Sequence, residues 1–480
     1  MIPTKNSIPF LRRPIAVLAL AALLAGCTVG PTYQRPDIAS PSAWKEAPAA
    51  EGWLPAAPAD ALDRGEWWKL FGDTGLDDLA ARVQVSNQNI AAAVASYTQA
   101  TALVRQQRAQ LFPQVSLSGT ARRSGDRTAG TATGTSTATL GVDWAADVWG
   151  RLRLAVSSAQ AQAQASEADL ASARLSAQGL LATNYFSLRE ADAELALLSN
   201  TIEGYERSLA IARNRYEAGI AAQSDVLQAQ TLLVNTRAER VQLQGTRANL
   251  EHAIAVLVGV APADFKLAAL PDWAPVVPAV PLGVPSTLLQ RRPDIAAAER
   301  AVASANAQIG IQRSAYFPDF SLSATLGKSA FGIGDLFNAS NTLWSIGLQA
   351  TQVLFDAGAI SAGVDAATAG RDVAVANYRQ TVLTAFQNVE DQLTATASLA
   401  EQETLRREAS AAADKTEQQI LNRYRAGQVS YTDVVIAQAS ALNARRNVLQ
   451  LQVNRQTAAV GLIQGLGGGW QFNPDKVAAE

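Results

Sequence analysis

Residues 113–122 read PQVSLSGTAR, and residues 318–327 read PDFSLSATLG. In both stretches apolar or small residues alternate with polar or charged ones, which is the period of a β-strand with two different faces. A second alternating run follows each stretch, at residues 138–145 and 344–351. One face of these strands suits lipid and the other suits water, as expected of strands in a membrane barrel.

The four strands are expected to form two hairpins, at residues 113–148 and 318–355, with polar, glycine-containing outer loops at 123–136 and 328–341. A soluble β-sandwich would need more strands than these. The smallest membrane barrels have about eight strands, so several chains must combine to close one. Two, three or four chains would give about eight, twelve or sixteen strands, and strand counting does not choose among them.

The chain also contains two copies of one unit. Residues 214–219 (NRYEAG) recur as residues 422–427 (NRYRAG), and an Asp follows each Gly at the same spacing. The offsets between matching segments are about 205 to 208 residues, which indicates a tandem duplication. We predict a first repeat at residues 27–258 and a second at residues 287–465.

Very long helices occupy most of each repeat. Residues 151–218 and 358–426 contain no Pro, so each could form a helix on the order of 100 Å long. A shorter partner helix is expected after each, with tip turns at residues 218–223 and 426–430. The alternative of a periplasmic coiled-coil scaffold would leave the four amphipathic strands unexplained.

Irregular segments separate these units. Residues 259–286 are rich in Pro and are predicted to form a linker in a belt around the helices, and residues 466–480 form a C-terminal tail with three consecutive glycines.

The N-terminus carries export and anchoring signals. Basic residues precede an apolar run at residues 15–24, which is too short to span a bilayer. The run ends in Leu-Ala-Gly-Cys at residues 24–27, which resembles the lipobox of bacterial lipoproteins, so residues 1–26 are expected to be a lipoprotein signal peptide. Cys27 would then be acylated, and Thr28 after it is compatible, by the same resemblance, with the outer membrane. The alternative is an ordinary signal peptide and a coincidental Cys.

Composition argues against several other classes. The formal net charge of -2 argues against a nucleic-acid partner. Cys27 is the only cysteine and His252 the only histidine, so neither a disulfide framework nor a Cys/His metal site is expected. The tripeptide Gly327-Lys328-Ser329 lacks the first Gly of a phosphate loop. We therefore do not expect an enzyme.

Four further segments carry a family resemblance: residues 67–73 (WWKLFGD), 291–295 (RRPDI), 306–310 (NAQIG) and 316–318 (YFP). In order and spacing they resemble the TolC-like outer-membrane efflux factors, specifically the lipoprotein branch (OprM/NodT-like) of tripartite RND-type efflux systems. The resemblance implies an α+β membrane protein, a homotrimer with a 12-stranded outer-membrane β-barrel continuous with a 12-helix periplasmic α-barrel. It also implies docking to an inner-membrane RND-type pump through a periplasmic adaptor (membrane fusion) protein, and no cofactor besides the lipid on Cys27.

The two helix turns are the predicted gate and adaptor-docking tip. The glycines suit the left-handed end of a helix, and the arginines lie in the last turn, where cations suit the helix dipole. Ser430 and Asp433 have capping-box spacing, but Ala222 stands in the first repeat where Ser430 stands in the second, so capping does not explain why both repeats carry an Asp. The candidate residues are Arg215, Tyr216, Gly219, Asp225, Arg423, Tyr424, Gly427 and Asp433.

In a three-fold assembly, copies of Asp433 would form a ring near the pore axis that attracts cations weakly. The resemblance implies an acidic constriction held closed by polar contacts until the adaptor docks; Val429 departs from that pattern, because a polar or basic residue is expected there.

The expected mechanism is passive conduction, with substrate and energy supplied by partners. The exported cargo is not encoded in these motifs. A duct of a type I protein secretion system and a metal-export system remain alternatives with the same architecture.

Overall fold

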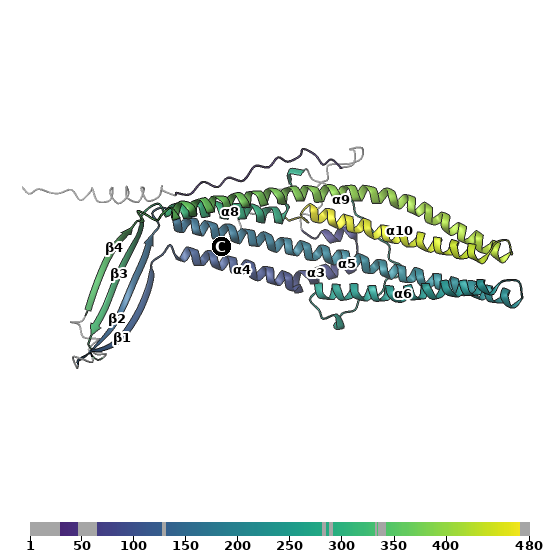
Figure 1. The fold of residues 1–480 in the computed structure, drawn as a ribbon, viewed down its shortest axis with the longest axis horizontal. Coiled ribbons are helices and arrows are strands. Elements are labelled where there is room, and N and C mark those ends of the chain that lie inside the picture. Colours follow the sequence, from purple (N-terminus) through teal and green to yellow (C-terminus); the bar gives the residue numbers. More distant parts are fainter. Residues whose placement is uncertain are drawn as a thin grey trace, which may run out of the picture.

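A computed structural model describes residues 29–46, 65–126, 131–280, 285–287, 291–331, 334 and 342–470. The molecule is elongated, with a sheet at one end and long helices that run away from it toward two hairpin tips at the other end (Figure 1). The signal peptide, Cys27 and residues 471–480 of the tail lie outside the described residues. Within the part that the structure describes, no helix is both long and apolar enough to cross a bilayer.

One antiparallel sheet contains the four predicted strands. They are β1 (Gln114–Asp126), β2 (Thr131–Ala146), β3 (Asp319–Ala330) and β4 (Thr342–Thr351), in the order β1-β2-β3-β4. The register aligns Leu117, Leu140, Leu326 and Trp344 in one row across the sheet. All four side chains are exposed in the single chain, so the alternating pattern does produce an apolar face that no other part of this chain covers.

The strands extend further than predicted. Much of the stretch 123–136, expected to be a loop, is paired in β1 and β2, and β3 continues to Ala330 into the second expected loop. Small polar residues are the cause of this difference. Thr and Ser suit a strand when one face meets water, so a polar run is not by itself a loop signal.

Helices of equal length make up the rest of the two halves. The helices α4 (Gln88–Ala109) and α8 (Pro293–Ser314) each have 22 residues. The helices α5 (Arg151–Glu217) and α9 (Ala359–Arg425) each have 67, and α6 (Gln223–Leu257) and α10 (Tyr431–Gly465) each have 35. Equal lengths are what duplication of one unit would produce, while the repeat boundaries stay a prediction.

A core midway along the helices involves the first of the family segments. Trp67 and Phe71 of the short helix η1 (Trp67–Phe71) are almost fully buried, and the Trp67 indole Nε1 donates to Gln178 Oε1 at 3.2 Å. Asp73 caps the next helix, α3 (Thr74–Ser86), and accepts a hydrogen bond from the Tyr185 hydroxyl at 2.8 Å. The tryptophans are therefore packing residues.

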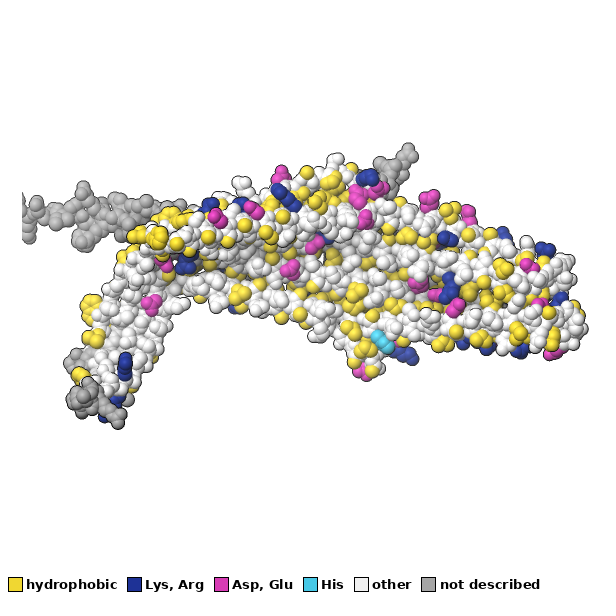
Figure 2. All heavy atoms as spheres, in the orientation of Figure 1, with side chains coloured by type: hydrophobic (Ala, Val, Ile, Leu, Met, Phe, Trp, Pro, Cys, Tyr) yellow, Lys and Arg dark blue, Asp and Glu magenta, His cyan; other side chains and the backbone are white. Residues whose placement is uncertain are grey.

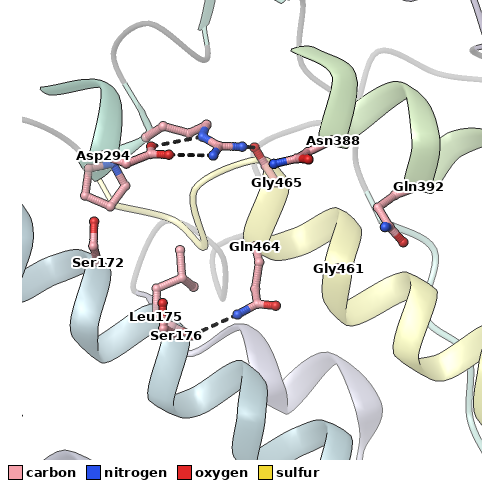
Figure 3. Close-up of a pocket in the computed structure, with 11 residues that line it drawn as sticks. Ser172, Leu175, Ser176, Asp294, Asn388, Gln392, Gly461, Gln464 and Gly465 are labelled. Carbon is pink, nitrogen blue, oxygen red and sulfur yellow. Dashed lines mark hydrogen bonds and ion pairs between the residues drawn. The ribbon is translucent and has the colours of Figure 1, made fainter. Parts of the chain in front are cut away.

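The Arg-Pro-Asp segment begins α8. Pro293 occupies the first turn, and Arg292 donates to Asp294 at 2.6 Å and to the Gly465 carbonyl at 3.1 Å, so it joins α8 to the end of α10. These residues border a polar cavity of about 360 Å³ between α5, α8, α9 and α10, into which Gln464 extends (Figure 3).

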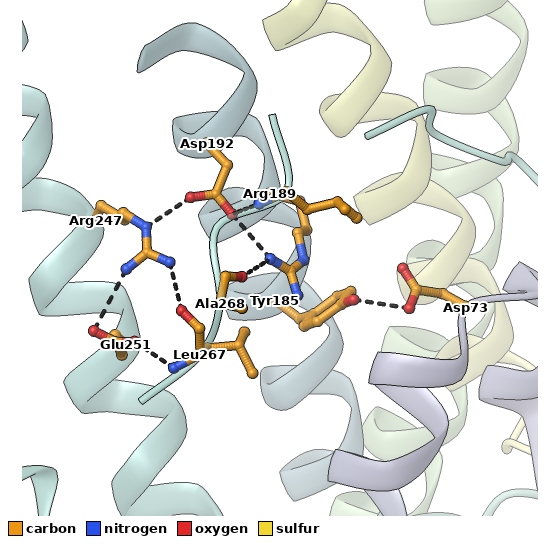
Figure 4. Close-up of polar contacts among 9 residues, drawn as sticks. Asp73, Tyr185, Arg189, Asp192, Arg247, Glu251, Leu267 and Ala268 are labelled. Atoms are coloured by element: carbon orange, nitrogen blue, oxygen red, sulfur yellow. Dashed lines mark hydrogen bonds and ion pairs between the residues drawn. The ribbon is translucent and has the colours of Figure 1, made fainter. Parts of the chain in front are cut away.

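The described part of the Pro-rich linker is fastened to α5 and α6 by buried ion pairs. Asp192 of α5 lies between Arg189 and Arg247, at 2.9 and 2.6 Å (Figure 4). The same arginines donate to the linker carbonyls of Ala268 and Leu267 at 2.8 Å each. This network fixes the belt segment to both helices of the first hairpin.

Candidate functional site

The two hairpin tips have the same backbone closure. Gly219 and Gly427 have φ of 75° and 72°, in the left-handed region that favours Gly. Each glycine N–H donates to the carbonyl three residues earlier, Tyr216 or Tyr424, at 2.9 Å. The next N–H closes onto the carbonyl of Arg215 or Arg423, also at 2.9 Å. These paired bonds satisfy carbonyls at the ends of α5 and α9 that would otherwise lack partners.

Arg215 joins the two tips within one chain. Its Nη1 donates to the carbonyls of Tyr424 and Arg425 at 2.9 and 3.3 Å, and its Cζ lies 4.8 Å from the centre of the Tyr424 ring. The sequence suggested an interaction with the dipole of its own helix. The guanidinium instead caps the C-terminal end of α9 on the neighbouring hairpin, where the unpaired carbonyls carry partial negative charge.

A buried aromatic pair lies beneath this contact. The rings of Tyr424 and Tyr431 are 5.2 Å apart at 68°, and both residues are almost completely buried. Burial and then the negative charge of Asp225 raise the pKa of Tyr424. Burial raises the pKa of Tyr431 to about 12, with smaller contributions from Tyr424 and Asp225. Both hydroxyls therefore remain protonated at neutral pH.

Tyr431 is a site residue that the sequence reasoning missed. An available signal was its position directly after the N-cap Ser430, seven residues beyond Tyr424. Nothing local, however, indicates that the two rings meet.

The two aspartates have different environments. Asp433 Oδ2 accepts from the Ser430 N–H at 3.0 Å and from its hydroxyl at 2.7 Å, which completes a capping box at the start of α10. Asp225 has no such cap, because Ala222 precedes α6, and it lies instead near the buried tyrosines. Capping thus accounts for one aspartate and not for the other.

The remaining predicted residues are not gathered into this cluster. Tyr216 is 44% exposed whereas Tyr424 is 2% exposed, although they occupy matching positions of the repeats. Arg423, the counterpart of Arg215, is also exposed, and so is Asp433. The chain therefore contains one half of a repeated contact in closed form and presents the matching residues of the other half on its surface.

Charge is distributed unevenly along the molecule. Figure 2 shows charged side chains along the helical part and few of them on the visible face of the sheet. This distribution fits a sheet in a membrane and a helical part in water.

The comparisons with known proteins agree with this geometry. The family model described as "Outer membrane efflux protein" matches residues 79–260 and 284–468. The probable efflux pump outer membrane protein TtgC of Pseudomonas putida is 32% identical, over 95% of both chains. The cation efflux system protein CusC of Escherichia coli is 29% identical, over 94% of this chain and 98% of the relative. The solved outer-membrane channel OprN has a TM-score of 0.84 at 30% identity, covering 93% of this chain and all of that chain.

Sheet, helices and tips together define the subunit of an outer-membrane channel with the TolC fold, and the predicted fold class is confirmed. The chain belongs to the outer membrane efflux protein family. Its function is that of the outer-membrane channel of an efflux pump, which transports and does not catalyse a reaction.

Proposed function

We propose that this chain is the lipid-anchored subunit of a homotrimeric duct that passively conducts drugs or other small molecules across the periplasm and outer membrane. The observation that carries the proposal is the open four-stranded sheet, whose outer strands β1 and β4 each have one partner. Three chains would supply about twelve strands and leave no free edge. A periplasmic adaptor protein and an inner-membrane RND-type pump would deliver the substrate.

The tip is the proposed gate. Arg215 bridges the two hairpins of one chain, and its counterpart Arg423 and the counterpart of Tyr424, Tyr216, are exposed. In a ring of alternating first and second hairpins, Arg423 of each chain would reach the end of α5 in the next chain and repeat the contact. The closed tip would then be a ring of six such contacts, three within chains and three between them, that adaptor docking opens.

Crosslinking tests the contacts between chains. With Cys27 as the only native cysteine, the double variant Tyr216→Cys/Arg423→Cys should form disulfide-linked multimers in membranes and lose efflux until a reductant is added. A matched pair, Arg215→Cys/Tyr424→Cys, should crosslink only within one chain. Exclusively monomeric crosslinks from both pairs would contradict the ring.

Cys27 is the proposed lipid attachment site, on the basis of the lipobox that precedes it. Cells grown with a palmitate analogue should label the wild-type chain and not the Cys27→Ser variant. The variant should still assemble in part, because the sheet also holds it in the membrane. Label that persists on Cys27→Ser would disprove the attachment site.

The cargo is proposed from relatives. The similarity to TtgC favours small organic compounds, while the similarity to CusC keeps metal export as a second candidate. A deletion strain should become sensitive to drugs and solvents rather than to metal cations. Capture of an ATP-driven exporter with the crosslinked adaptor, in place of an RND-type pump, would instead indicate a type I secretion duct.

A further inference from the structure

The first described residues form a strap along α8. The Tyr33 hydroxyl donates to Glu299, Asn306 Nδ2 donates to the Pro31 carbonyl at 2.9 Å, and the Val29 N–H donates to the Trp149 carbonyl at 3.3 Å. Because Glu299 precedes Asn306 along α8, the strap approaches the sheet as it is followed back toward the N-terminus. The chain before Val29 therefore leaves the strap at the junction of helices and sheet.

A glycine crossing fixes the position of this strap. A Cβ atom placed on Gly310 would lie 2.7 Å from Gly30 Cα and 2.6 Å from Leu154 Cδ1, so the two backbones approach closely only because both residues are Gly. Gly310 and Asn306 are one turn apart on the same face of α8, which gives the segment 306–310 a structural purpose. The counterparts in the first repeat, about 205 residues earlier, are Arg105 and Thr101, so the crossing occurs in one repeat only.

A cavity lies where the strap ends. It has a volume of about 480 Å³, within the usual range of ligand pockets, and lies between the foot of the sheet and the adjoining ends of α5, α8 and α9. Its apolar walls include Trp149, Leu152, Ile311, Phe317, Val353 and Ile360. The rings of Trp149 and Phe317 stack at 4.8 Å and form one side. Asp147 at its edge is engaged by the N–H groups of Leu152 and Arg153 at 2.9 and 3.0 Å.

Covalent reach connects Cys27 with this cavity. Three residues separate Cys27 from Gly30, so they span at most about 11 Å. At about 1.5 Å per residue along a helix, that distance corresponds to about seven residues beyond Gly310, which is the level of Phe317. Two residues from Val29, which is bonded to Trp149, lead to the same place.

We propose that one acyl chain of the lipid on Cys27 occupies the apolar cavity lined by Trp149, Ile311 and Phe317, and that the Gly30/Gly310 crossing sets its position. The remaining chains would enter the bilayer. The anchor would then brace the joint between sheet and helices in addition to holding the protein at the membrane. This inference rests on the proposed acylation of Cys27.

The test uses the full-length protein, purified in detergent from cells fed a fatty acid that carries a photoreactive diazirine. After irradiation, mass spectrometry should find the N-terminal lipopeptide crosslinked to peptides that contain Trp149, Ile311 or Phe317. Crosslinks confined to the exposed strand faces would overturn the seat while leaving the anchor intact. Free phospholipid adducts in the cavity, equally abundant in Cys27→Ser, would assign the cavity to membrane lipid and overturn the proposal. An unmodified Cys27 would overturn the anchor and the seat together.

Two variants test the crossing. Gly310→Ala should leave the mass of the acylated N-terminus unchanged and lower the cavity crosslinks at least about fivefold, which corresponds to about 1 kcal/mol. Asn306→Ala, which removes one hydrogen bond without a clash, should lower them less and serves if Gly310→Ala does not assemble. Gly245→Ala is the matched control, because a Cβ there meets nothing within 4 Å. Undiminished crosslinks in both test variants would contradict the role of the crossing.

Discussion

The guanidinium of Arg215 lies 4.8 Å from the ring of Tyr424 and donates to the carbonyl of the same tyrosine at 2.9 Å. Because these residues belong to different hairpins, the two tips of one chain are coupled. Any movement that opens the tip must either break this contact or move both hairpins together.

Removal of the contact should favour the open channel. Arg215→Ala loses a cation–π contact and a charge-assisted hydrogen bond, together about 1 to 2 kcal/mol, so the open fraction should rise roughly 5- to 30-fold. Single-channel recording in planar bilayers measures this fraction. The exposed Arg213→Ala on the same helix is the control, and equal recordings from the two variants would argue against coupling.

The ring of Asp433 predicts a cation effect. Asp433→Asn removes three negative charges from a trimer, so block by divalent cations should weaken or conductance should rise. Ser430→Ala disrupts the capping box but keeps the charge, and it should leave the block unchanged. Unchanged conductance and block in Asp433→Asn would count against the ring.

Gly427 is predicted to be needed for adaptor docking. Its φ of 72° is costly for a β-branched residue, by about 1 to 2 kcal/mol, and a larger side chain would also occupy the groove beside it. Gly427→Val should abolish drug resistance while trimers persist on native gels. Gly427→Asn, which tolerates this backbone conformation, separates strain from docking. Full resistance in Gly427→Val would refute the docking role.

The network around Asp192 is predicted to matter for stability. Its side chain is fully buried between Arg189 and Arg247, so Asp192→Ala leaves two cations without their partner and should lower the free energy of unfolding by about 3 to 5 kcal/mol. Asp372→Ala removes a surface ion pair and should cost less than about 1 kcal/mol. Denaturant titration followed by circular dichroism compares the two, and similar midpoints would be the contrary result.

Glu190 predicts a pH dependence of stability. Burial, and then the charge of Glu194, raises the pKa of Glu190 from 4.5 to about 7. Between these values the folded state holds a proton that the unfolded state has released, so stability falls as pH rises from about 4.5 to about 7. The slope is at most about 1.4 kcal/mol per pH unit for one group. Glu190→Gln should flatten it in denaturant titrations at several pH values, and an unchanged slope would show that other groups cause it.

The features that are periodic in the sequence could be predicted from it. Alternation at residues 113–122 identified strands, and the repeated NRYxAG segments identified the tips, because strand faces and helix ends follow from local chemistry. Contacts between distant segments could not be predicted in this way. Arg215 reaches another hairpin, Tyr431 packs on Tyr424, and Gly310 fits Gly30, yet none of these partners is encoded near the residue itself.

The open sheet has a consequence for how the protein is made. A lone chain inserted in a bilayer would expose the backbone N–H and C=O groups along the outer edges of β1 and β4 to hydrocarbon, at several kcal/mol for each unpaired group. Subunits therefore have to meet before or during insertion. A copy with a defective edge strand would be built into complexes with normal copies, and its defect would behave as dominant in a cell that makes both.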